Sequence, residues 1–63
     1  PRSMYDLSKL EAYVTGDFTG HGIEIGTKVL VMYKSRYGTG KYRVRVNGEM
    51  REVSEKELEP III

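Results

Sequence analysis

The sequence predicts a small, mainly β domain: an antiparallel barrel of about five short strands, with a short N-terminal helix and one helical turn before the last strand. Two runs, residues 27–34 and 41–46, are rich in β-branched and aromatic side chains that alternate along the chain, as in strands. Asn47-Gly48 follows the second run directly, and this dipeptide is the strongest short signal for a tight β-hairpin turn. A chain of 63 residues is long enough for one such domain only.

The composition and the apolar runs limit the class of protein. The chain has no Cys, so no disulfide framework or thiolate metal site can support the fold, and this fits an intracellular location, in the cytoplasm or the nucleus. The longest uninterrupted apolar run is Val29 to Tyr33, far short of the roughly 20 residues of a membrane span, so no membrane contact is expected. Residues 1–3 precede the first Met and are interpreted as a cloning remnant, which leaves 4–63 as a single domain. The chain could equally be a domain cut from a longer protein.

Residues 5–14 are the best candidate for the helix. Asp6 suits a helix N-terminus, and Gly16 can supply the left-handed residue that ends a helix. The apolar residues recur at helical spacings of three and four: Leu7, Leu10 and Val14. The alternative for the second half of this segment is a strand over residues 11–15. A Gly-rich loop is expected over residues 16–26, with a short strand at 21–25.

The strand over residues 27–34 is apolar on both faces. Val29, Val31 and Tyr33 are expected to point to one side, and Leu30 and Met32 to the other. Such a strand is predicted to be central, with the barrel core on one side and the helix on the other.

The next strand, residues 41–46, has a clean alternation. Tyr42, Val44 and Val46 are predicted to face inward, with Lys41, Arg43 and Arg45 outward. A two-residue turn at 47–48 pairs Arg43 with Glu52 and Tyr42 with Val53 in a third strand, residues 49–53. The same register places Arg51 opposite Val44, which is unfavourable unless a bulge or a longer loop corrects it.

The single helical turn is predicted over residues 54–58. Ser54 is the expected N-cap, and Glu57, three residues later, completes a capping box. Leu58 is expected to close one end of the barrel, and residues 61–63 to form a final short strand. The predicted core consists of Val29, Val31, Tyr42, Val44 and Leu58.

Charge is distributed unevenly along the chain. The net charge is only +1, but residues 25–48 carry six basic residues and no acid, whereas both flanking segments are net acidic. This asymmetry indicates a polyanionic partner for the middle segment. The candidate nucleic-acid-binding residues are Lys34, Arg36, Tyr37, Lys41, Arg43 and Arg45.

Three of these candidates share one strand face. Alternation spaces Lys41, Arg43 and Arg45 roughly 6.6 Å apart, comparable to the separation of successive phosphates, and arginine forks match phosphate geometry. Tyr37, in the preceding loop, could stack on a base. The alternative is a strand face that Lys and Arg keep soluble, with Arg43 and Glu52 as a cross-strand ion pair.

The other candidate sites are weaker. Phe18, Tyr33, Tyr37 and Tyr42 could form a cage for a methylated Lys or Arg, but the favoured interpretation places Tyr33 and Tyr42 in the core with their hydroxyls at its rim. His21 is expected to be an exposed loop residue, and the acids of the C-terminal segment (Glu55, Glu57 and Glu59) to be solvated. No nucleophile, paired carboxylates or metal-ligand spacing stands out, so neither an enzyme nor a cofactor is expected.

Four features together resemble the SH3-like small barrels, which include the Tudor, KOW and chromo-barrel groups. They are an opening Gly26-Thr27-x-Val29-x-Val31, a basic turn, a Tyr42-Arg43-Val44 strand and a closing Leu58-Glu59-Pro60-Ile61. The resemblance covers residues 26–62 and implies a five-stranded barrel in a family that mostly binds RNA, DNA or protein tails without catalysis. A KOW unit would have a Gly soon after its first strand and a Tudor unit a further strand before residue 49, so the subfamily stays open.

The expected function is therefore a non-catalytic module that binds DNA or RNA by its phosphate backbone through the basic hairpin of residues 34–45. The alternative is a protein-interaction or adaptor module, including one that self-associates through contact between the acidic segment of residues 49–59 and the basic hairpin of another copy.

Overall fold

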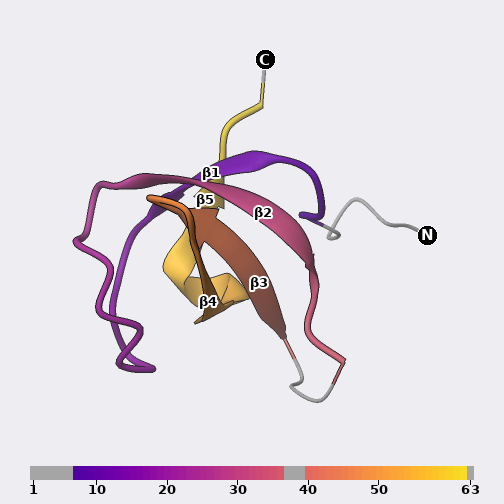
Figure 1. The fold of residues 1–63 in the computed structure, drawn as a ribbon. Helices are drawn as coiled ribbons and strands as arrows, with labels where there is room; N and C mark the ends of the chain where they lie inside the picture. The colour runs from indigo at the N-terminus through magenta and orange to yellow at the C-terminus, as the bar shows by residue number, and fades with distance from the viewer. Residues whose placement is uncertain (1–6, 37–39, 63) are drawn as a thin grey trace.

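The fold is a single curled antiparallel sheet (Figure 1). The computed structural model describes residues 7–36 and 40–62. Its elements are β1 (Glu11–Val14), β2 (Lys28–Lys34), β3 (Lys41–Val46), β4 (Glu49–Ser54), the 3-10 turn η2 (Glu55–Glu57) and β5 (Leu58–Pro60). The strand order is β4-β3-β2-β1-β5, so β4 and β5 are the two edges and the sheet is not closed. The prediction of a mainly β domain with one helical turn before the last strand is confirmed. The predicted closure of the strands into a barrel is wrong, because β4 and β5 do not pair with each other.

The predicted N-terminal helix is wrong, and the alternative strand is correct. Residues 11–14 form β1, which pairs with both β2 and β5. Lys9 has a positive φ of 71°, and its N–H donates to the Val31 carbonyl at 2.7 Å, so the chain already runs along β2 before β1 begins. A ten-residue helix is marginal alone, and pairing with two strands satisfies the same backbone groups while burying Ala12 and Val14. Residues 1–6, including the proposed cloning remnant, lie outside the described residues.

β2 is the central strand, as predicted. In the part of the chain that the structure describes, no helix covers its outer side, so Leu30 is 38% exposed. The β2–β3 ladder shifts register between Val31 and Tyr33: Val31 pairs with Val44, whereas Tyr33 pairs with Arg43. This bulge reverses the alternation, because the extra residue turns the following side chains over. Tyr33 therefore lies on the outer side and not in the core, which corrects the sequence prediction.

The β3–β4 hairpin has the predicted turn and register. Asn47 and Gly48 both have positive φ, 51° and 76°, as a type I′ turn requires. Arg43 pairs with Glu52, and no bulge intervenes to move Arg51 from its position opposite Val44. Arg51 remains 43% exposed and turns its guanidinium toward the rim, where it donates to the His21 carbonyl at 3.3 Å and to Glu49 at 2.7 Å.

Replacing Gly48 with Val is expected to cost at least about 1 kcal/mol of the free energy of unfolding. A Cβ at Gly48 meets no atom within 4 Å, so the cost comes from the positive φ alone. Urea denaturation measures the change, and Gly48→Asn is the matched control, because Asn tolerates the left-handed region. A Val variant as stable as the Asn variant would contradict the assignment of this strain to the turn.

The core lies inside the curl of the sheet. All five residues predicted for it are buried, and the others are Ala12, Val14, Ile23 and Val53. Ile23 enters from the loop of residues 15–27, where no strand forms, so the predicted strand at 21–25 is wrong. The last strand is β5, not residues 61–63: Ile61 and Ile62 follow it, and Ile63 lies outside the described residues. In the described part of the chain, no helix has the length and apolar character needed to cross a membrane.

Candidate nucleic-acid interface

The outer face is the solvent-facing side of β2 and β3 together with Arg36 of the loop after β2. Its residues are Lys28, Leu30, Tyr33, Arg36, Arg43 and Arg45. Arg43 and Arg45 are exposed and project from β3 as predicted. Across the ladder, Tyr33 lies opposite Arg43 and Leu30 opposite Arg45. Each arginine therefore has a large, partly exposed apolar or aromatic neighbour on the adjacent strand.

The structure brings only some of the six predicted residues together. Arg36, in the loop after β2, lines one hollow with Tyr33, Ser35 and Arg43. Lys41 is half-buried at the start of β3. Tyr37 lies outside the described residues.

Lys34 is separated from the arginines by the bulge. Lys34 pairs with Tyr42, whose side chain faces the core. The ammonium nitrogen of Lys34 lies 5.9 Å from the centroid of the Tyr42 ring. Together with Gly40, Ser54, Glu55 and Lys56, it lines a different hollow. Lys34 therefore belongs to another surface than Arg43.

The arginines of the outer face make no ion pair with any described carboxylate. The ion pairs that the described residues form involve His21 and Arg51. Glu52 lies opposite Arg43 in the ladder, as the alternative interpretation requires, yet the two do not form an ion pair. Arg36, Arg43 and Arg45 thus keep their donors available to an external anion.

The outer face is less uniformly basic than the sequence of residues 25–48. Neighbouring strands bring acids beside it: Glu11 of β1 lies opposite Leu30, and Glu52 of β4 lies opposite Arg43. The unpaired arginines consequently form a local group: Arg36 and Arg43 line one hollow, and Arg45 lies one row away.

The proposed aromatic cage does not form from the described aromatics. Tyr42 is fully buried and its hydroxyl accepts from the Leu7 N–H at 3.2 Å, whereas Tyr33 is 53% exposed on the opposite side of the sheet. Phe18 is 83% exposed on the loop of residues 15–27. The interpretation of Tyr42 as a core residue is confirmed, and the same interpretation of Tyr33 is wrong.

His21 is buried, contrary to the expectation of an exposed loop residue. Its Nδ1 accepts from the Ile23 N–H at 2.9 Å, so the proton lies on Nε2, which donates to the Gly16 carbonyl at 2.7 Å. Both ring nitrogens are therefore used to hold the 15–27 loop in its conformation.

Glu57 is also buried, and the prediction that it belongs to a solvated acidic face is wrong. One carboxylate oxygen accepts from the Ser54 N–H and the Thr19 hydroxyl, each at 2.9 Å, which confirms the capping box. The other accepts from the backbone N–H groups of Phe18 and Thr19. Burial alone would raise the pKa of Glu57, but these hydrogen bonds, led by the one from the Thr19 backbone, hold the pKa below its ordinary value.

Asp17, His21 and Glu57 bring three possible metal ligands within 4.8 Å of one another. Carboxylate and imidazole donors suit several divalent metals. Here, however, all three side chains already make hydrogen bonds. His21 Nε2 donates to the Gly16 carbonyl, and the Asp17 carboxylate accepts from the His21 backbone N–H at 2.9 Å. The Glu57 carboxylate accepts from four donors. A cation would have to displace these bonds, so the cluster is better explained as an internal anchor of the loop.

No family model, curated protein or solved structure matches this chain significantly.

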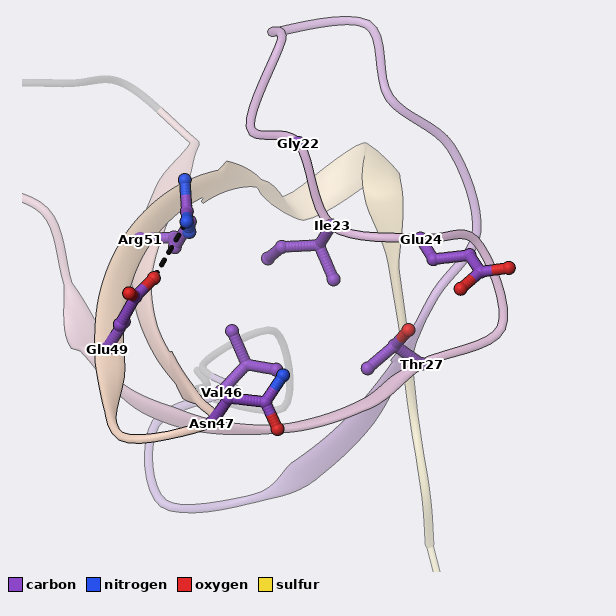
Figure 2. A pocket seen from close by; sticks show the side chains of 8 residues that line it. All are labelled: Gly22, Ile23, Glu24, Thr27, Val46, Asn47, Glu49 and Arg51. Carbon is purple, nitrogen blue, oxygen red and sulfur yellow. Dashed lines mark hydrogen bonds and ion pairs between the residues drawn. The ribbon is translucent and has the colours of Figure 1, made fainter.

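A third hollow opens at the end of the sheet beside the β3–β4 turn (Figure 2). Ile23 and Val46 point into it, and the Glu49–Arg51 ion pair stands on one side. Glu24, Thr27 and Asn47 complete the rim. Glu49 and Arg51 neutralise each other in their ion pair, so this hollow should attract a charged ligand less strongly than the outer face.

Proposed function

We propose that this chain is a non-catalytic, SH3-like module that binds nucleic acid through the phosphate backbone, using the outer face. The observation that carries the proposal is the group of three arginines, Arg36, Arg43 and Arg45, which pair with no described carboxylate. Guanidinium groups bind phosphate through two parallel hydrogen bonds, and each phosphate contact releases condensed counterions. Five strands and a helical turn before the last one support the SH3-like assignment.

The test is a titration of the whole chain with short DNA and RNA at several salt concentrations. With about three phosphate contacts, the logarithm of the association constant should fall against the logarithm of salt with a slope of roughly −3 on duplex DNA. Arg43→Ala combined with Arg45→Ala should weaken binding to all sequences alike and flatten the slope by about one to two units. Both side chains are exposed, so the fold should persist.

The matched control is Lys34→Ala combined with Lys56→Ala. It removes the same charge from a hollow that is separate from the outer face, and should weaken binding far less. Equal weakening by the two double variants would show that net charge, not the outer face, governs binding. No binding to DNA or RNA at low salt would refute the proposed function.

A protein-interaction module is the second candidate, because the outer face also exposes Leu30 and, across Arg45, Met50. In its self-associating form, the acidic residues 49–59 of one copy meet the basic hairpin of another. Glu57 is not available for that contact, since it is buried. A concentration-dependent mass in solution, together with a failure to bind nucleic acid, would favour this candidate.

A further inference from the structure

The bulge in β2 gives the outer face an aromatic ring that the sequence pattern hides. Without the register shift, Tyr33 would follow Val29 and Val31 into the core; with it, Tyr33 lies opposite Arg43 and is 53% exposed. Its ring lines the same hollow as Arg36 and Arg43. An exposed aromatic side chain in one hollow with two unpaired arginines is a place where a planar base and its phosphates can both be bound.

A simpler pairing, of one partly exposed apolar or aromatic side chain with one cation, recurs on and beside the outer face. Tyr13 of β1 lies opposite Lys28, Leu30 lies opposite Arg45, and Tyr33 lies opposite Arg43. All three apolar members are partly exposed, at 46%, 38% and 53%. Rows on one face of a sheet are roughly 6.6 Å apart, comparable to the separation of successive phosphates in an extended strand.

A surface that places exposed rings next to cations can distinguish single-stranded from double-stranded nucleic acid. In a duplex the faces of the bases are stacked on one another, so only phosphates and base edges can reach a sheet surface. A single strand can turn its bases toward the protein and stack them on exposed rings, which every base allows. Cations alone would bind the phosphates of both forms, whereas the exposed Tyr33 ring adds binding energy only when it contacts an unstacked base.

We propose that the outer face selects single-stranded nucleic acid, with Tyr33 stacking on one base while Arg36 and Arg43 bind the adjacent phosphates. This inference rests on the proposed function and names the form of nucleic acid that the face takes. Tyr13 and Leu30 extend the apolar surface for the neighbouring nucleotides.

The experiment compares a labelled 12-nucleotide oligo(dT), an oligo(rU) of the same length and a 12-base-pair DNA duplex by fluorescence anisotropy, with the whole chain at one low salt concentration. We expect the single strands to bind about tenfold or more tightly than the duplex. Tyr33→Ala should weaken single-strand binding about fivefold or more, as loss of one stacked base predicts, and leave duplex binding unchanged. Tyr33→Phe retains the ring and should retain the affinity.

Phe18→Ala is the matched control, since it removes an exposed aromatic from the 15–27 loop, outside the outer face, and should leave single-strand binding unchanged. Thermal melting of each variant checks the fold. Duplex binding as tight as single-strand binding, or equal weakening of both by Tyr33→Ala, would overturn the inference while leaving nucleic-acid binding intact. No binding to any of the three probes would instead overturn the proposed function itself.

Discussion

Replacing Glu57 with Ala should lower the free energy of unfolding by about 2–4 kcal/mol, because it leaves several donors inside the protein without an acceptor. The carboxylate accepts from the N–H groups of Phe18, Thr19 and Ser54 and from the Thr19 hydroxyl. A domain of this size has a small total stability, so the loss is a large part of it. Urea denaturation followed by circular dichroism measures the change.

Glu55→Ala is the matched control, since Glu55 lies in the same turn but is exposed. Its effect should stay within about 0.5 kcal/mol. A Glu57→Ala variant as stable as the Glu55→Ala variant would show that the carboxylate does not hold the loop.

The stability should also depend on pH in a defined direction. The folded-state pKa of Glu57 lies below the ordinary value of 4.5, so the contribution of the ionised carboxylate is complete above that pH. It is lost as the pH falls through the folded-state pKa. The difference between the wild type and Glu57→Ala should therefore be largest near neutral pH and shrink below pH 4.5; a difference that grows in acid would contradict this assignment.

Replacing Tyr42 with Ala should cost about 3–5 kcal/mol, as other large-to-small changes of buried aromatics do. Tyr42 is the largest fully buried side chain, and it stands opposite Val53 on β4 and Lys34 on β2. The same denaturation experiment measures the loss.

Tyr42→Phe separates packing from hydrogen bonding at this position. It keeps the ring and removes only the hydroxyl that accepts from the Leu7 N–H, so it should cost about 1 kcal/mol. If Tyr42→Ala cost no more than Tyr42→Phe, the ring would not be contributing to the core.

The hairpin of β3 and β4 was predictable because its information is local. Alternation in residues 41–46 and the Asn47-Gly48 turn together determine the register, and the pairing of Arg43 with Glu52 follows from them. β1 was mispredicted because helical spacing of apolar residues competed with a strand pattern of only four residues. Pairing with β2 and β5 decided between them, and that pairing is not visible in residues 5–14.

The sequence predicted the positions of candidate-site residues that depend on a single strand. It did not predict positions that depend on how several strands pair. Arg43 and Arg45 follow from alternation within β3, but the bulge that turns Tyr33 outward and Lys34 away has no sequence signal. The capping box identified one set of bonds made by Glu57. Its other partners lie 38 and 39 residues away along the chain, beyond the reach of any local motif.

The bonds from Glu57 to Phe18 and Thr19 also bear on the order of folding. They join the first third of the chain to its C-terminal segment, so these bonds to the 15–27 loop require Glu57 of η2 to be in place. Contacts between residues distant in the sequence slow folding, because a long loop must close before they contribute. The β3–β4 hairpin can form from neighbouring residues alone, whereas we expect this loop to become ordered later, because it depends on residues near the end of the chain.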